Sequence, residues 1–254
     1  MSEVEPKKYI QFLVSPQLDF IGKNKPENNQ SKGIDLHVGE GCIQRLRGEG
    51  KFDPFVEISE HILKRSATSG GKFSVVLDED WHNTNDPEFA IFKQHCIKGS
   101  KGASLPKELE PYRWNDYTYT IRANSINVAS HRHYQQALKS IMGTERPERF
   151  TRTEEVRVGV YGVWTHIKVE YLLLSLSTMP PAVFPRQNLG VCAPLCASPD
   201  SADHDYAIQK FAKLGYTVFD DILSYLAWMD LSPDKTLQRS IESFQKETSP
   251  STRR

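Results

Sequence analysis

The sequence predicts an α/β fold in which helices cover both faces of a central, mainly parallel sheet. Short apolar segments rich in β-branched residues alternate along the chain with segments whose apolar residues recur at helical spacing. Several of the predicted strands are continuously apolar, which is typical of parallel strands that are buried on both faces. Polar residues follow three of these strands, and ligands of open α/β sheets bind at the carboxyl ends of strands.

The predicted elements follow one another in a regular order. The first strand, "KYIQFLVSP", ends at a proline and precedes a polar loop over residues 23–33. A helix follows within residues 52–71, because Phe55, Ile58 and Ile62 share one face with Leu63 and a glycine pair ends the segment. Further strands are predicted at 72–82, 117–125, 156–163 and 187–195, further helices at 130–142, 165–176 and 200–216, and a short strand with a last helix within 217–229.

Residues 1–232 are assigned to one domain, because their apolar content is sufficient for one core of ordinary size. Residues 233–254 are mostly polar and are predicted to form a partly disordered C-terminal tail. Within this tail, Leu237, Ile241 and Phe244 could form one helical stripe.

Composition excludes several classes of protein. The chain carries 32 acidic and 32 basic side chains, so its formal net charge of zero gives no sign of bulk nucleic-acid or membrane-surface binding. The longest apolar run is too short to span a bilayer, and the N-terminal residues do not have the pattern of a signal peptide. The four cysteines are scattered, which favours free thiols in a reducing, cytoplasmic environment.

A candidate metal site lies at the end of the strand predicted at 72–82. Asp80 and His82 are two residues apart, so in an extended strand both side chains point the same way. His95 can reach them from the following loop. One carboxylate and two imidazoles, with water completing the shell, suit zinc, and also iron or manganese. Surface Asp and His residues at a strand end are common without a metal, so spacing alone leaves both interpretations open.

Lys168 occupies an unusual position in the segment "GVYGVWTHIKVEYLLLSL". A strand there runs through a sharp turn into a helix, and the free N–H groups at a helix start favour anions or a thiolate. A lysine is disfavoured at such a place.

Four motifs together resemble the isochorismatase-like cysteine hydrolases, which include the nicotinamidases. "LVSPQLDF", "DEDWH", "QHCIKGSKGA" and "GVWTHIKVEYLLLSL" occur in the order of the family patterns "VDxQxDF", "DWH", "HCxxGTxGA" and "GVxTDxCV", over roughly residues 8–230. The resemblance implies a three-layer α/β/α sandwich with metal ligands at Asp80, His82 and His95. It also implies a cis peptide between Val163 and Trp164, and assembly as a homo-oligomer.

The sequence departs from the family at its catalytic positions. The family's catalytic Asp falls on Ser15, its nucleophilic Cys on Lys168 and its catalytic Lys on Arg122. Cys96 neighbours a metal ligand in the motif and does not replace the nucleophile. True isochorismatases also lack the Cys, and their "GVYAH" turn resembles "GVWTH" here, including His166, but they need the acid that Ser15 cannot supply.

Three interpretations of Lys168 follow. The ammonium could lie in solvent, with its stem covering apolar surface. It could join Ser15, Arg122 and the helix start in a cationic cup that binds a small anion, unless Asp19 neutralises it. It could instead be a neutral, nucleophilic amine. Asp19, Trp81, Trp164 and His166 are the candidate substrate-binding residues around this pocket.

The leading functional prediction is a divergent isochorismatase-like protein with a divalent-metal site and a pocket for a small anionic molecule. Without the cysteine-hydrolase residues, it is either a binding or regulatory pseudoenzyme or an enzyme with rewired chemistry. One rival is an active hydrolase of a small amide or vinyl ether that uses metal-bound water or Lys168. Another rival is a structural partner subunit whose pocket is filled by Trp164 or Lys168.

Overall fold

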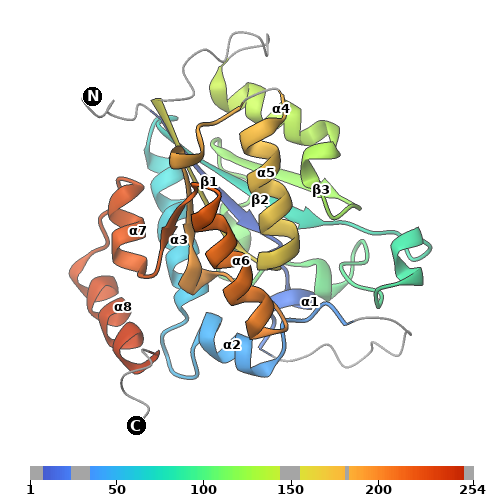
Figure 1. Ribbon diagram of the computed structural model, residues 1–254, viewed down its shortest axis with the longest axis horizontal. Coiled ribbons are helices and arrows are strands. Elements are labelled where there is room, and N and C mark those ends of the chain that lie inside the picture. The colour runs from blue at the N-terminus through green and yellow to red at the C-terminus, as the bar shows by residue number, and fades with distance from the viewer. Residues whose placement is uncertain (1–7, 24–34, 144–154, 181–182, 249–254) are drawn as a thin grey trace.

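The computed structural model describes residues 8–23, 35–143, 155–180 and 183–248. Six parallel strands form one sheet in the order β3-β2-β1-β4-β5-β6 (Figure 1). The strands are β1 (Lys8–Val14), β2 (Phe73–Asp80), β3 (Thr118–Ala123), β4 (Val156–Gly162), β5 (Leu189–Cys192) and β6 (Thr217–Phe219). The α/β class predicted from the sequence is therefore confirmed.

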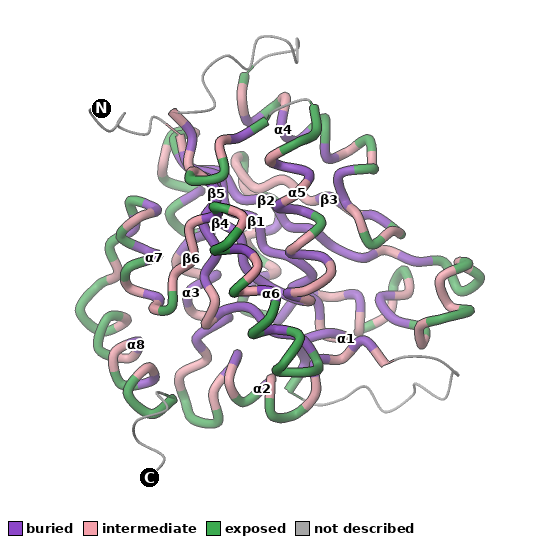
Figure 2. Tube along the Cα trace, viewed as in Figure 1, coloured by how far each residue is buried: buried purple, intermediate pink, exposed green. Residues whose placement is uncertain are grey.

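Helices connect the strands and cover both faces of the sheet, which gives three layers. They are α1 (Leu18–Ile21), α2 (Glu40–Arg47), α3 (Pro54–Thr68), α4 (Arg132–Met142), α5 (Glu170–Thr178), α6 (Ser201–Lys213), α7 (Ile222–Trp228) and α8 (Lys235–Thr248). Right-handed crossovers place α3 on one face and α4, α5 and α6 on the other, and Figure 1 shows α5 and α6 in front of the sheet. The strands are mostly buried, and the exposed residues lie on the outer helices and loops (Figure 2).

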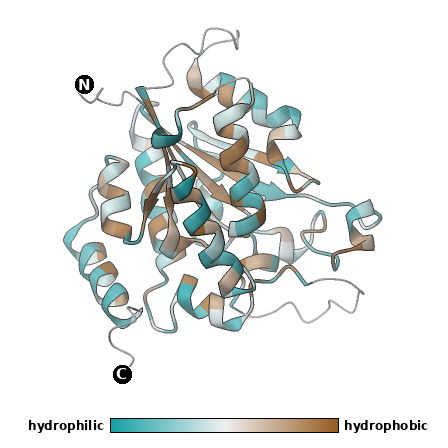
Figure 3. Ribbon diagram, viewed as in Figure 1, coloured by the Kyte–Doolittle hydropathy of each residue, from teal (hydrophilic) through white to brown (hydrophobic). Residues whose placement is uncertain are grey.

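The core follows the hydrophobic pattern of the sequence. All eight residues of β2 are buried, as a strand covered on both faces requires. Helix α3 begins at Asp53, whose side chain accepts a hydrogen bond from the Val56 amide at 3.2 Å, and its predicted apolar face is fully buried. Hydrophobic residues concentrate in the central strands and on the inner sides of the helices (Figure 3).

The segment assigned to the C-terminal tail is helical where the structure describes it. Ile241 and Phe244 are buried on α8, which packs against α3 and α7. Residues 235–248 are therefore part of the folded unit, and the boundary at residue 232 does not separate them from the core. The polar loop at 23–33 lies outside the described residues except for Lys23. No helix in the described part of the chain is long and apolar enough to cross a membrane.

The order of the strands locates the place for a ligand. The chain steps outward from β1 to β2 and β3, and then returns to place β4 on the other side of β1. Ligands of open α/β sheets bind at such a switch, beyond the carboxyl ends of the strands. Ser15 follows β1, and the turn containing Trp164 follows β4, so both lie at this switch.

Candidate functional site

Backbone pairing at the end of β2 brings the three predicted metal ligands together. Asp80 is the last residue of β2, and His82 forms a parallel bridge with Ile97. The His82 amide donates to the Cys96 carbonyl at 3.1 Å, and the Lys98 amide donates to the His82 carbonyl at 2.9 Å. These two hydrogen bonds hold the loop so that His95 lies beside the end of the strand.

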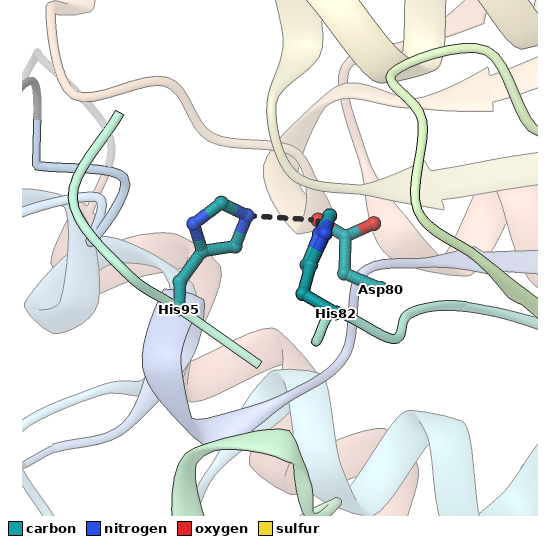
Figure 4. A group of neighbouring side chains, drawn as sticks. All are labelled: Asp80, His82 and His95. Atoms are coloured by element: carbon teal, nitrogen blue, oxygen red, sulfur yellow. Dashed lines mark ion pairs between the residues drawn. The ribbon is translucent and has the colours of Figure 1, made fainter. Parts of the chain in front are cut away.

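The side chains of Asp80, His82 and His95 point toward one another (Figure 4). One ligand atom from each lies within 4.8 Å of the others, and all three residues are buried. Asp80 Oδ2 is 3.4 Å from His95 Nε2 and 3.7 Å from His82 Nε2. The predicted convergence of these three residues is therefore confirmed.

Glu88 adds a second carboxylate to this group, and the sequence analysis missed it. Its Oε1 atom is 3.2 Å from His95 Nε2 and 3.4 Å from His82 Nε2. Glu88 lies in a short 3₁₀ turn, Pro87–Ala90, between the two histidines. The sequence feature that could have indicated Glu88 was an acidic residue in the loop between two predicted metal ligands, His82 and His95.

Both imidazoles are oriented so that their Nε2 atoms face the carboxylates. The Nδ1 atom of His95 is 2.8 Å from the Lys93 carbonyl, and that of His82 is 3.2 Å from Asp86 Oδ2. In the neutral imidazole each Nδ1 is placed to donate its proton, and Nε2 then offers a lone pair. Neither Nε2 atom has a hydrogen-bond partner among the described residues, although both are buried. Metal-binding histidines have this arrangement, in which an outer partner fixes the ring.

The charged neighbours shift the pKa of two of these ligands. Burial alone would raise the pKa of Asp80, but Lys168 and the two histidines hold it well below its usual range. Burial would lower the pKa of His95, but Asp80 and Glu88 outweigh it and raise that pKa to about 9. Two carboxylates thus surround the imidazoles and favour a positive charge between them.

Lys168 lies inside the protein, where acidic neighbours favour its charged form. It reaches Asp80 Oδ1 from a π-helical turn, Thr165–Val169, that begins the helix of α5. Burial alone would lower the pKa of Lys168, but Asp80 and Asp78 outweigh burial and raise it above its ordinary value. This geometry is inconsistent with an ammonium in solvent, and the charge is inconsistent with a neutral, nucleophilic amine.

Asp78 is a second residue that the sequence analysis missed. It is buried two residues before Asp80, on the same face of β2. Burial raises its pKa to about 7, against the opposing effect of Lys168 and with a further increase from Asp80. An acidic residue within the apolar run "SVVLD" was the signal, because such a residue needs a nearby partner.

Ser15 lies at the end of β1 with an unusual backbone. Its φ of 47° is in the left-handed region, and its amide donates to the Asp78 carbonyl at 2.8 Å. Its hydroxyl is buried and has no hydrogen-bond partner among the described residues. Ser15 therefore lies at the sheet end as expected, as an unsatisfied donor.

Arg122 does not join Ser15 and Lys168, so the predicted cationic cup is not assembled. In the sheet register Arg122 pairs with Glu79, while Asp80 pairs with Ala123. Neighbouring residues of a strand point to opposite faces, so Arg122 lies on the face opposite Asp80. Its Nε is 3.3 Å from Glu79 Oε2, and its guanidinium lies 4.1 Å from the centre of the Trp81 ring. Trp81 accompanies Arg122 and does not wall the metal pocket.

Asp19 was the internal candidate to neutralise Lys168, but it has another partner. Its Oδ2 atom accepts a hydrogen bond from the Cys96 amide at 2.6 Å, so it fixes the loop next to His95. A Cβ at Gly102 would lie 2.0 Å from the Asp19 carboxylate, which explains the glycine there.

Burial, followed by the charge of Asp80, raises the pKa of the Cys96 thiol well above its ordinary value. Cys96 is one of four free thiols and is unsuited to act as a nucleophile.

A narrow cavity lies beside the metal ligands. Its free volume of about 20 Å³ is near the space that a single ordered water needs. Trp164 Nε1 donates to the Leu36 carbonyl at 2.8 Å, which fixes the indole across the cavity. His166 does not line this cavity, since its Nδ1 lies 2.8 Å from Ser198 Oγ. The lining residues are Phe20, Leu36, Asp80, Glu88, Phe92, Ile126, Trp164, Ile167 and Lys168.

The peptide bond between Val163 and Trp164 is cis, as the sequence resemblance implied. It lies where the chain leaves β4 and enters the turn that carries Lys168.

Comparison with solved structures identifies the fold. A nicotinamidase/pyrazinamidase from Bacillus subtilis matches with a TM-score of 0.61 and 16% identity, over 84% of this chain and 100% of that one. An isochorismatase-like hydrolase from Alkaliphilus metalliredigens matches with a TM-score of 0.59 and 17% identity, over 87% and 99% of the two chains. A pyrazinamidase from Pyrococcus horikoshii, solved in complex with zinc, matches with a TM-score of 0.54 and 16% identity, over 84% and 98%.

No family model and no curated protein sequence matches this chain. The fold is therefore established by structure alone. It is the isochorismatase-like hydrolase fold that the motifs implied.

Proposed function

We propose that this protein binds a divalent metal ion, most suitably zinc, and does not carry out cysteine-hydrolase chemistry. The observation that carries the proposal is the pair of buried Nε2 atoms, on His82 and His95, that face two carboxylates and have no hydrogen-bond partner in the described part of the chain. Leaving buried polar atoms unsatisfied costs free energy, and a cation between them would satisfy all four groups. The zinc complex of the similar Pyrococcus horikoshii pyrazinamidase supports this choice of metal.

The number of ligands favours a binding or structural role for the metal. Glu88 lies within 3.4 Å of both Nε2 atoms and could add a fourth ligand to Asp80, His82 and His95; structural zinc sites use four protein ligands, whereas catalytic sites keep one position open. A bound ion would act as a Lewis acid and would tie the loop that carries Glu88 and His95 to the end of β2. Hydrolysis by metal-bound water is therefore the less favoured alternative.

The residues at the family's catalytic positions support the proposal that the protein does not carry out cysteine-hydrolase chemistry. Lys168 is a charged ammonium paired with Asp80, so it supplies neither a thiolate nor a free amine. Ser15 has no carboxylate with which to take a proton. Cys96 is buried, and its high pKa keeps the thiol protonated.

A small anion is the proposed ligand of the narrow cavity. Lys168 lines the cavity, and the metal would add positive charge beside it. The free volume of about 20 Å³ admits only the smallest anions unless Trp164 moves. Arg122 has no part in this recognition, because it lies on the other face of the sheet.

Metal analysis and an activity screen test the proposal. Zinc titration of metal-free protein should give one ion per chain, and nicotinamide should release no ammonia with or without a chelator. Chelator-sensitive ammonia release at an ordinary enzymatic rate would contradict the proposal and favour the hydrolase alternative. Release that is abolished by a thiol alkylator bound to Cys96 would contradict it in favour of cysteine chemistry.

Thermal-shift measurements test the anion. Formate, acetate and phosphate are titrated against zinc-loaded wild type and Lys168→Ala. We expect formate to stabilise the wild type and to lose this effect in the variant. Equal shifts in both proteins would remove Lys168 from the proposed recognition.

A further inference from the structure

A second cavity lies on the opposite face of the sheet, and it differs in character from the metal cavity. It has a volume of about 270 Å³ and is open to solvent. Trp81, Ser104, Glu110, Arg113, Trp114 and Arg122 are among the residues that line it. Two indoles and two guanidinium groups thus converge on one opening.

The buried carboxylate of Glu79 lies beneath this cavity and is shared by both arginines. Glu79 is fully buried, and its Oε1 atom pairs with Arg113. Arg113 is satisfied a second time by Glu110, through contacts of 2.9 Å from Nε and 3.1 Å from Nη2. Arg113 is therefore held by two carboxylates and has little capacity left for a ligand.

Arg122 is only partly satisfied. Its single hydrogen bond to a described residue runs from Nε to Glu79 at 3.3 Å, so both terminal Nη atoms lack a partner there. The side chain is 34% exposed, and the Trp81 ring beneath it holds the guanidinium plane in place. A fixed guanidinium with a free Nη edge is suited to bind a carboxylate or phosphate through two hydrogen bonds.

Trp114 supplies a flat apolar surface at the same opening. Its indole is 78% exposed, the largest exposure among the large hydrophobic residues of the described chain. An exposed tryptophan costs solvation free energy unless something covers it, and aromatic rings stack readily on indoles. The free guanidinium edge of Arg122 and the exposed indole of Trp114 thus suit a ligand that has both an anionic group and a planar ring.

We propose that this cavity binds an oxyanion, either a carboxylate or a phosphate, that is attached to a planar ring. The oxyanion contacts the Nη atoms of Arg122, and the ring lies against Trp114. The site is independent of the metal and of the function proposed above, because Glu79 and Asp80 point to opposite faces of β2.

Binding of phenyl phosphate and benzoate, measured by calorimetry, tests the proposal, with inorganic phosphate as the ring-free probe. We expect phenyl phosphate or benzoate to bind more tightly than inorganic phosphate. Arg122→Gln should weaken binding by about tenfold or more, as loss of a hydrogen bond to a charged group predicts. Trp114→Ala should remove the advantage of the ring. Lys107→Gln, which removes a 91% exposed lysine outside the cavity, is the matched control and should have no effect.

Several results would overturn the proposal. One is the absence of saturable binding to the wild type. Another is binding that His95→Ala weakens and Arg122→Gln does not, which would place the probe in the metal cavity. A third is a dimer that Trp114→Ala converts to a monomer while probe binding is unchanged, because the exposed indole would then belong to a contact between copies of the chain.

Discussion

The two faces of the sheet at the end of β2 each hold a buried carboxylate paired with a cation and a neighbouring cavity, but the two cavities differ. Asp80 and Glu79 are consecutive, and each buried carboxylate is paired with a cation, Lys168 on one face and two arginines on the other. Beside Asp80 the cavity is narrow, and the unsatisfied atoms are lone pairs on two imidazoles. Beside Glu79 the cavity is open, and the unsatisfied atoms are guanidinium donors.

The difference lies in which atoms lack partners among the described residues. Both faces hold acidic and basic groups: Asp78, Asp80, Glu88 and Lys168 on one, and Glu79, Glu110, Arg113 and Arg122 on the other. The imidazoles and carboxylates around Asp80 favour a positive charge between them, whether a proton or a metal ion, whereas the free donors of Arg122 favour an anion. One short segment of sequence therefore contributes residues to both proposed sites, which differ in the charge of the ligand they would favour.

Removal of a metal ligand tests the Asp80 face most directly. His95→Ala deletes one of the proposed ligands, so we expect zinc affinity to fall by more than about a hundredfold. In the wild type, zinc at about 100 times its Kd should raise the free energy of unfolding by about 2.7 kcal/mol. Urea unfolding with and without zinc measures this difference, which should vanish in the variant.

His133→Ala is the matched control, because this histidine lies on α4, away from the site. Zinc should stabilise His133→Ala as much as the wild type. Equal stabilisation of His95→Ala would show that the face of Asp80 does not hold the ion.

Breaking the ion pair on the other face should destabilise the protein by about 3–5 kcal/mol. Glu79→Gln leaves the buried Arg113 guanidinium without one of its two carboxylates, and zinc binding should not change. Glu110→Gln is the control, since Glu110 contacts the same arginine but is 39% exposed, and its loss should cost much less. Urea unfolding measures the loss of stability in both variants. Equal losses would show that the buried Glu79 carboxylate stabilises the protein no more than the exposed Glu110 carboxylate does.

The sequence predicted the fold and the metal half of the site because both rest on local patterns. Continuous apolar runs such as β2 and the helical face of α3 depend on neighbouring residues only. The spacing of Asp80 and His82 is likewise local. His95 was proposed from the following loop, the motif match then supported it, and its position was confirmed.

Arg122 was placed on the wrong face because its position depends on register. A shift of one residue between β2 and β3 would exchange Arg122 with Ala123, and the sequence of either strand alone does not set this alignment. Glu88 was missed for a related reason, since a loop contact has no periodic signal. Asp19 was the internal candidate partner for Lys168, and only the folded chain shows Asp19 hydrogen-bonded to Cys96 and Lys168 paired with Asp80.

Acid should destabilise the protein through a group that belongs to neither face. His204 is buried with its Nδ1 at 3.0 Å from Thr165 Oγ1, and burial, aided by Arg45, lowers its pKa from 6.5 to about 4. Between these values the unfolded chain binds the extra proton, so the free energy of unfolding falls as the pH falls, by about 3 kcal/mol in total. Urea unfolding at about pH 7 and about pH 4.5 measures this loss.

The variant His204→Gln should lose less stability than the wild type over the same range of pH. An unchanged pH dependence would assign the acid sensitivity to the carboxylates around β2 and so to one of the two faces.

The smallest expected effect concerns the charge of Lys168 beside the proposed metal ion. Lys168 and the metal would share the carboxylate of Asp80, and two cations on one carboxylate repel each other. Lys168→Met keeps the length of the side chain and removes the charge, so we expect zinc to bind about tenfold more tightly, or about 1.4 kcal/mol. Competition with a fluorescent chelator measures the affinity. Lys210→Met, which breaks a partly buried ion pair with Glu170 away from the site, is the control. Weaker zinc binding by Lys168→Met would mean that the lysine orients Asp80 more than it competes with the ion. In that case the two faces of β2 would be alike, each using its cation to hold a carboxylate in place.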